Sequence, residues 1–195
     1  VAGIPVTGEN RWAFLSSGTW SLIGMEYPHA IINEKSFEHQ FTNEGGVQGT
    51  IRLLKNVTGL WLVQQCRSYW AEQGHKLSYS ELTDLARSAK PFKARLDVDH
   101  EPFLSPGNMP EKINTYLKST GQDRIDDKGQ MVRVILESLA VRYAEVIEML
   151  EELSGDHIET LHIVGGGIKN TLLNKFTADS TGKKVVTGPA EATAT

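Results

Sequence analysis

The sequence contains a single cysteine, Cys66, among its 195 residues. One cysteine forms neither a disulfide within the chain nor a zinc cluster, so we interpret Cys66 as a small buried hydrophobe. The sequence also lacks an apolar run of about 18 residues, which a membrane-spanning helix requires, and no signal peptide opens it. We therefore expect a cytoplasmic protein without a membrane partner.

Basic residues are scarce relative to acidic ones. Twenty Lys and Arg stand against 24 Asp and Glu, which gives a formal net charge of −4. A nucleic-acid-binding surface normally carries a basic patch, so we expect no nucleic-acid partner. Hydrophobic residues make up 39% of the chain, as in ordinary globular proteins. Since there are no internal repeats and no low-complexity linker, we expect residues 1–195 to be one domain.

The two ends of the chain have unusual features. The first residue is Val1 rather than Met, and Pro189–Thr195 stands where a helix is expected to begin. We therefore interpret both ends as cut.

The first half of the chain predicts strands and then helices. Two apolar, β-prone runs, Trp12–Ser17 and Trp20–Met25, flank Gly18 and Thr19, which predicts a hairpin. A helical period predicts a long helix from Leu53 to Gln73. The other predicted elements are a third strand after the Asn43–Gly46 turn, a helix with a capping box at Ser78 running to Ala89, a strand over Ala94–Val98, and a helix from Asn108 to about Gly121.

The last third of the chain alternates helices and strands. A 3.6-residue period predicts a helix over Asp127–Leu153. A buried strand over Ile158–Val164, a Gly165–Gly167 turn, a helix over Asn170–Ser180 and a strand over Lys184–Thr187 then follow. Such alternation predicts an α/β sheet.

The glycine triplet Gly165–Gly167 is the first candidate site. Ligands of open α/β sheets bind at the carboxyl ends of strands, and a helix N-terminus favours anions. A tight turn without a ligand is the alternative. A dinucleotide fingerprint is excluded because Asn170 stands where its third glycine belongs. A Walker loop is excluded because Gly182-Lys183-Lys184 lacks the Ser or Thr.

Two further features fit a phosphate or sugar site. Backbone amides and the Thr19 hydroxyl in the Ser16–Thr19 turn can cradle a phosphate, although the same residue types make ordinary turns. Asn56 and Gln64 are eight residues apart on the predicted helix, roughly 12 Å along its axis. They face either one cleft or solvent.

Acidic residues provide weaker candidates. The run from Asp97 to Glu101 includes two aspartates and His100, which suit either a metal ion or a solvated turn. Glu44 is either a catalytic acid or a turn residue. Neither has the spacing of a known metal or catalytic motif, so we predict no metal site.

Four segments together resemble the FGGY family of carbohydrate kinases, which includes glycerol and xylulose kinases. They are Phe14–Gly24, Thr42–Gly46, Leu54–Leu62 and Leu161–Asn174. The resemblance continues through Gly188–Thr193 and is loose only at residues 31–40 and 73–126. It implies the C-terminal, nucleotide-binding lobe of such a kinase. The implied fold is a ribonuclease-H-like lobe of the actin-like ATPase type, with a central sheet, helices on both of its faces and an N-terminal hairpin.

The resemblance also implies a reaction and a set of binding residues. Segment Leu54–Leu62 is most similar to family members that transfer the γ-phosphoryl group of ATP to the 1-hydroxyl of L-rhamnulose. Magnesium would be bound largely through the nucleotide phosphates. The implied contacts are Thr19 to the γ-phosphate, Gly166 to the nucleotide near its ribose and α-phosphate, Asn170 beside the adenine, Gln64 as a further ATP contact, and Asn56 to the ketose.

The general base of the family lies outside this sequence. The resemblance places it on an aspartate upstream of Val1, and it places most sugar contacts on the N-terminal lobe of the same enzyme. We therefore expect no catalytic residue in this chain and little or no activity from the chain alone. The alternatives are a kinase of another sugar, such as fuculose or xylulose, and a non-catalytic, actin-like nucleotide-binding module.

Overall fold

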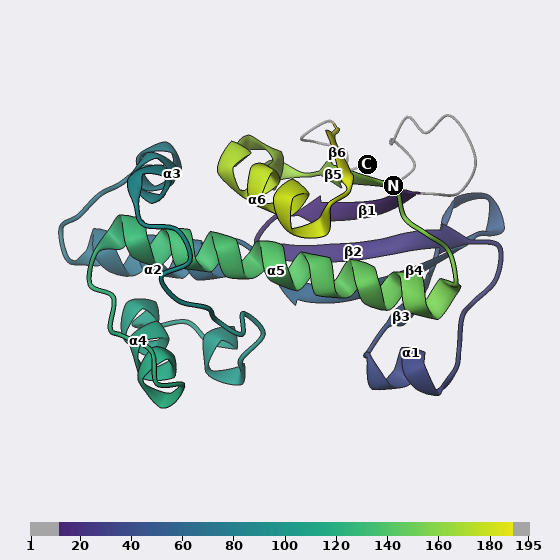
Figure 1. Cartoon of the computed structure of the whole chain (residues 1–195), viewed down its shortest axis with the longest axis horizontal. Helices are drawn as coiled ribbons and strands as arrows, with labels where there is room; N and C mark the ends of the chain where they lie inside the picture. The colour runs from purple at the N-terminus through teal and green to yellow at the C-terminus, as the bar shows by residue number, and fades with distance from the viewer. Residues whose placement is uncertain (1–11, 189–195) are drawn as a thin grey trace.

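The computed structural model describes residues 12–188, and six strands in this part of the chain form one mixed sheet (Figure 1). The strands lie in the order β3-β4-β2-β1-β5-β6. Their bounds are β1 Trp12–Ser17, β2 Trp20–Tyr27, β3 Thr42–Gly45, β4 Ile51–Thr58, β5 Thr160–Val164 and β6 Lys184–Thr187.

Within the described residues, the helices lie between β2 and β6 in the chain. Helix α5 is by far the longest and runs across the sheet, while α2, α3 and α4 gather around one of its ends (Figure 1). Their bounds are α1 Glu34–Glu38, α2 Trp61–Glu72, α3 Tyr79–Ser88, α4 Met109–Ser119, α5 Lys128–Ser154 and α6 Thr171–Thr181, with short 3₁₀ turns η1 Val47–Gly49, η2 Glu101–Leu104 and η3 Gly166–Lys169.

Strand β1 occupies the centre of the sheet. It pairs antiparallel with β2, which confirms the predicted hairpin, and parallel with β5. Strand β5 in turn pairs parallel with β6. In the β1–β5 ladder Ser16 lies opposite Val164, so the hairpin turn and the glycine triplet that follow these residues lie at the same edge of the sheet.

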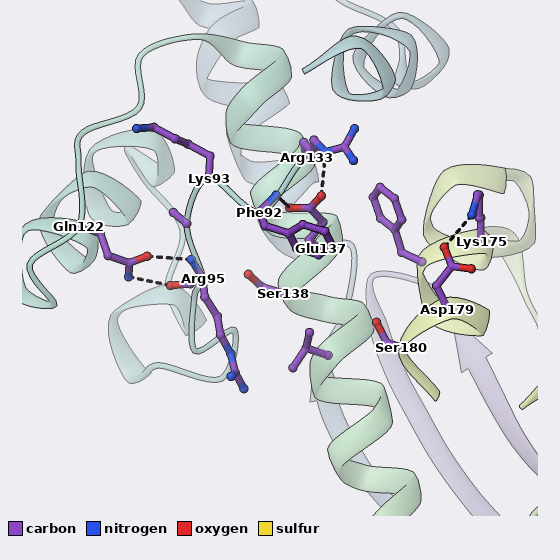
Figure 2. A pocket seen from close by; sticks show the side chains of 13 residues that line it. Phe92, Lys93, Arg95, Gln122, Arg133, Glu137, Ser138, Lys175, Asp179 and Ser180 are labelled. Carbon is purple, nitrogen blue, oxygen red and sulfur yellow. Dashed lines mark hydrogen bonds and ion pairs between the residues drawn. The ribbon is translucent and has the colours of Figure 1, made fainter. Parts of the chain in front are cut away.

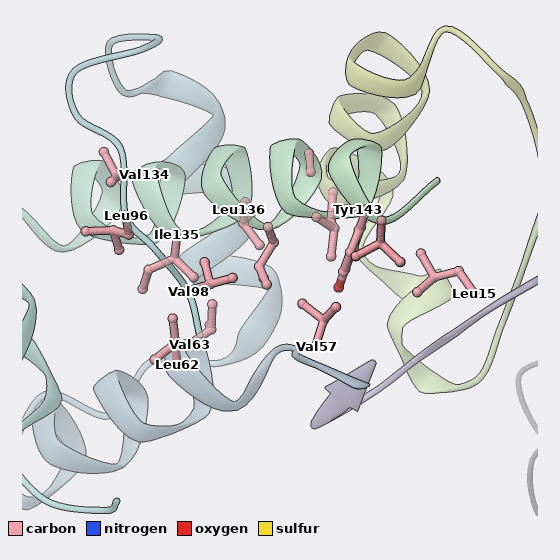
Figure 3. Close-up of a cluster of buried hydrophobic side chains, with 14 of the residues drawn as sticks. Leu15, Val57, Leu62, Val63, Leu96, Val98, Val134, Ile135, Leu136 and Tyr143 are labelled. Atoms are coloured by element: carbon pink, nitrogen blue, oxygen red, sulfur yellow. The ribbon is translucent and has the colours of Figure 1, made fainter. Parts of the chain in front are cut away.

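The two faces of the sheet carry apolar clusters of different size. On one face, Leu15 and Val57 join side chains of α5, including Tyr143, in a large buried core (Figure 3). The other face, here called the second face, has a smaller cluster of Phe14, Leu54 and Val164. The alternation of Phe14 and Leu15 follows from the two-residue period of a strand.

The α/β class is confirmed, and so are most of the predicted helices. Helix α5 begins one residue later than expected and ends one later, with Asp127 as its N-cap and Gly155 in the left-handed conformation after its last turn. The predicted capping box of Ser78 and Glu81 opens α3. Helix α6 and the predicted flanking strands are also present. The helix expected to start within Pro189–Thr195 lies outside the described residues.

The prediction of one helix from Leu53 to Gln73 is wrong over its first part. Residues 51–58 form β4, and the helix α2 begins only at Trp61. Strand β4 pairs with β2 on one side and with β3 on the other, and it buries Leu53 and Leu54 on opposite faces. A strand buried on both faces gives a continuous apolar run, which sequence periodicity confuses with a helix.

Two other predictions need correction. Residues 94–98 are not a strand, because side chains take the place of strand partners: Gln122 bonds both backbone groups of Arg95, and Ser138 Oγ accepts from Leu96 N. The turn expected at Asn43–Gly46 is displaced, since residues 42–45 are β3 and the chain reverses after Gly46.

Within residues 12–188, no helix has both the length and the apolar character needed to cross a membrane.

Candidate functional site

The hairpin turn after β1 and the glycine triplet after β5 are in close contact. A Cβ atom on Gly165 would lie 2.7 Å from Ser17 O, and one on Gly167 would overlap the Ser17 side chain. Gly165 also has a φ of +88°, which side-chain-bearing residues rarely adopt. Glycine is therefore required at both positions for the two loops to meet.

Gly166 differs from its two neighbours. A Cβ atom there would have no heavy atom within 4 Å, and Gly166 lines an open cavity. Packing does not require glycine at this position. A ligand can therefore approach the backbone of Gly166 directly.

The turn is held from the other side by the start of α2. Leu60 N donates to Gly18 O over 2.9 Å, and Trp61 N donates to Thr19 O over 3.0 Å. One turn further along, Gln64 Nε2 donates to Thr19 Oγ1 over 3.0 Å. Because this oxygen accepts from Gln64, the Thr19 hydroxyl proton is left to donate to another acceptor.

These loops and helices enclose a cavity of about 590 Å³. Thr19, Gln64, Gly166 and Asn170, which are far apart in the sequence, all line it. The four residues expected to bind a nucleotide are therefore brought together in one place. The complete lining is Gly18, Thr19, Leu60, Val63, Gln64, Tyr79, Ser80, Thr83, Asp84, Arg87, Gly166, Gly167, Lys169, Asn170 and Thr171.

Helix α3 forms a wall of the cavity that the sequence did not reveal. Tyr79, Thr83 and Arg87 are spaced four residues apart, which puts them on one side of the helix, while Leu82 and Ala86 are buried on another. This polar stripe was the available signal. What it could not show is that α3 lines the same cavity as the glycine triplet.

The start of α6 lies at the same cavity. Asn170 is its N-cap, and Asn170 Oδ1 accepts from Leu173 N over 3.0 Å. Lys169 and Arg87 bring positive charge to the lining, and Arg87 reaches Thr171 Oγ1 across 3.4 Å. Backbone amides at a helix N-terminus and basic side chains both favour an anionic ligand.

Asn56 is not where the sequence placed it. It is an exposed residue of β4, whereas Gln64 is on α2, so the two do not face one cleft from successive turns of a helix. Asn56 lies opposite Leu22 in the β2–β4 ladder, on the second face. Its assignment as a sugar contact remains a prediction.

A buried hydrogen bond lies next to the hairpin turn. Tyr143 of α5 and Ser21 of β2 are both fully buried, and their hydroxyl oxygens are 2.7 Å apart. Burial raises the pKa of Tyr143 to about 12, so the phenol is neutral at ordinary pH. This bond ties the start of β2, and with it the turn, to the long helix.

The acidic residues considered from the sequence have structural roles. Asp99 accepts from Thr58 N and from Arg142 Nε, each over 2.8 Å, while Glu44 pairs with Arg52. His100 packs edge-on against aromatic rings. In the part of the chain that the structure describes, no group of three or more His, Cys, Asp or Glu side chains is arranged to hold a metal ion.

Two other hollows, of about 650 and 640 Å³, contain none of the residues predicted to bind the nucleotide or the sugar. The first lies between α5, α6 and residues 92–95, and its charged side chains are used within the protein (Figure 2). Arg133 pairs with Glu137 over 2.7 Å, and Lys175 pairs with Asp179 over 2.6 Å. The smaller cavity at the hairpin turn is the better candidate, because it brings Thr19, Gln64, Gly166 and Asn170 together.

The family model and the curated relatives that match this chain agree on one family. The family model described as "FGGY family of carbohydrate kinases, C-terminal domain" matches residues 13–195. The chain is 48% identical over 194 residues to a rhamnulokinase of Bacteroides thetaiotaomicron and 42% identical over 194 residues to one of Ligilactobacillus salivarius. In each case the match covers 100% of this chain and 39% of the relative. The chain thus spans about two fifths of the length of these relatives.

Solved structures share the fold at low sequence identity. A xylulose kinase from Rhodospirillum rubrum has a TM-score of 0.70 at 14% identity, covering 93% of this chain and 36% of that one. A glycerol kinase from Plasmodium falciparum, solved with ADP, has a TM-score of 0.58 at 13% identity, covering 90% and 34%. These likenesses support the actin-like ATPase fold.

Proposed function

The chain belongs to the FGGY family of carbohydrate kinases, and we propose that it forms the ATP-binding lobe of an enzyme that phosphorylates the 1-hydroxyl of L-rhamnulose. The observation that best supports this proposal is that one cavity of about 590 Å³ is lined by Thr19, Gln64, Gly166 and Asn170. The rhamnulokinase names of its relatives support the choice of sugar.

The lining of the cavity suits a nucleotide. Open space beside Gly166 admits the ribose and α-phosphate, and the N-cap leaves the NH₂ of the Asn170 side chain as the group that can face the base. The Thr19 hydroxyl, oriented by Gln64, donates to the γ-phosphate. Lys169 and Arg87 add positive charge at the cavity. Preorganised donors of this kind stabilise the charge that develops during phosphoryl transfer.

Magnesium, bound mainly by the phosphates of ATP, would neutralise part of their negative charge. In the reaction the bond between the γ-phosphorus and the β-phosphate oxygen breaks as the ketose 1-oxygen bonds to phosphorus. The hydroxyl proton goes to a general base. We propose that this base, like the N-terminal lobe, belongs to a part of the enzyme outside this chain, so that the chain alone shows little or no turnover.

A coupled kinase assay on the full-length enzyme tests the proposal. L-rhamnulose, L-fuculose and D-xylulose are compared by kcat/KM with ATP as the donor, and the 195-residue chain alone is measured beside them. We expect L-rhamnulose to have the highest value and the isolated chain to be inactive. A higher kcat/KM for another ketose would mean that this ketose, rather than L-rhamnulose, is the substrate. No turnover of any sugar would favour a non-catalytic nucleotide-binding module.

A further inference from the structure

Trp20 is a large aromatic residue at the end of the hairpin turn, and 47% of it is exposed. It directly follows Thr19, which lines the candidate nucleotide cavity. Among the hydrogen bonds and ring contacts of residues 12–188, none involves the Trp20 side chain. By contrast, Trp61 donates to Phe103 O, and Trp12 packs edge-on against His162.

Trp20 and Asn56 lie on the same face of the sheet. Leu22 and Leu54 belong to the cluster of the second face. Side chains two residues apart on a strand share a face, so Trp20 lies with Leu22 and Asn56 lies with Leu54. The ladder pairs Leu22 with Asn56 and Trp20 with Thr58, which makes Trp20 and Asn56 diagonal neighbours within reach of one small molecule.

An exposed indole beside an exposed amide is a combination suited to a sugar. The ring presents an apolar surface to C–H groups, and the amide offers a donor and an acceptor to hydroxyl groups. Their position also fits, since Thr19, the proposed γ-phosphate contact, immediately precedes Trp20. A ketose lying on these two side chains would have its reacting end near the hairpin turn.

We propose that Trp20 is a specificity-determining residue that packs against the methyl end of the ketose. L-rhamnulose is a 6-deoxyketose, so its C6 is a methyl group, which gains from burial against the indole. A hydroxymethyl group at C6 would bring a hydroxyl to an apolar surface that offers it no partner. This inference rests on the proposed function, and it adds the residue that contacts the C6 methyl group of the sugar.

The test compares two ketoses in the full-length enzyme. L-fructose differs from L-rhamnulose only in bearing a hydroxyl group on C6. We expect the wild-type enzyme to prefer L-rhamnulose in kcat/KM by roughly tenfold or more, the usual discrimination by one small apolar contact. Trp20→Ala should lower kcat/KM for L-rhamnulose about tenfold and for L-fructose much less, while Trp20→Phe should keep most of the preference. The KM for ATP should change less than about twofold, because Trp20 is not part of the nucleotide cavity lining.

A matched control is Phe37→Ala, which removes an aromatic side chain of α1 that is 86% exposed. It should change neither the ratio between the ketoses nor the KM for ATP. Equal fold losses in kcat/KM for both ketoses in Trp20→Ala would overturn the inference, since they would show that Trp20 does not distinguish a methyl from a hydroxymethyl group at C6. If Trp20→Ala does not fold, Trp20→Leu is used instead, and it should lower the ratio of kcat/KM for L-rhamnulose to kcat/KM for L-fructose. A wild-type enzyme inactive on L-rhamnulose would refute the proposed function and this inference together, whereas an unchanged ratio in an active variant would refute this inference alone.

Discussion

The hydrogen bond from Gln64 to Thr19 yields the most specific prediction about the proposed nucleotide site. Gln64 Nε2 donates to Thr19 Oγ1 over 3.0 Å, which leaves the hydroxyl proton free to donate to the proposed γ-phosphate. Gln64→Glu reverses this arrangement, because a carboxylate accepts the hydroxyl proton. It also adds a negative charge at the cavity. Gln64→Ala only removes the donor.

The two variants should differ clearly in magnitude. A net hydrogen bond contributes about 1 kcal/mol, so Gln64→Ala should lower kcat/KM for ATP roughly fivefold. A carboxylate about 5 Å from a phosphate charge, at an effective dielectric constant of about 20, costs about 3 kcal/mol, so Gln64→Glu should lower it roughly 150-fold. Added salt should reduce the loss in Gln64→Glu, because exposed charges are screened.

The assay is steady-state kinetics of the full-length enzyme with ATP varied at a saturating ketose concentration. Gln65→Glu is the matched control, since it places the same charge on the next residue of α2, which does not line the cavity. Equal losses in Gln64→Ala and Gln64→Glu would refute the proposed orientation of Thr19. So would a loss in Gln65→Glu as large as that in Gln64→Glu.

Two further predictions concern the packing around the hairpin turn. Gly167→Ala should lower the free energy of unfolding by about 2 kcal/mol in a urea titration, because the added methyl overlaps Ser17; unchanged stability would contradict the close packing of the two loops. Tyr143→Phe should cost about 1.5 kcal/mol, because it leaves the buried Ser21 hydroxyl without its partner. Since burial raises the pKa of Tyr143 from 10.0 to about 12, folding keeps the phenol protonated, and stability should fall as the pH rises above 10.0. That fall should be smaller in Tyr143→Phe, and identical pH profiles of the two proteins would argue against a buried phenol.

The elements that the sequence predicted well are those with a local signal. The period of Asp127–Leu153, the capping box at Ser78 and the Gly18-Thr19 turn each depend on residues close together in the chain, and each matches the structure. Strand β4 was missed because its character depends on two neighbouring strands that are distant in sequence. Residues 94–98 were mistaken for a strand because their partners are the side chains of Gln122 and Ser138.

The candidate site was predictable for a related reason, but only in part. The resemblance identified residues of the turn, α2 and the glycine triplet, and the structure brings Thr19, Gln64 and Gly166 to one cavity. The wall formed by α3 lies where the resemblance is loose, so Thr83 and Arg87 had no motif to mark them. Asn56 was expected to share a helix with Gln64, and this error followed directly from the misassigned strand.

The most direct test of the proposed nucleotide site uses Gly166. A Cβ atom at this position would meet no heavy atom within 4 Å outside its two chain neighbours, so we expect Gly166→Val to fold normally while its methyl groups occupy space in the cavity. Isothermal titration calorimetry of MgATP binding to the full-length enzyme measures the effect, and thermal unfolding checks the fold. We predict a loss of affinity of at least about tenfold, corresponding to about 1.4 kcal/mol, with a nearly unchanged Tm. Wild-type affinity in a well-folded Gly166→Val enzyme would contradict the assignment of this cavity to ATP.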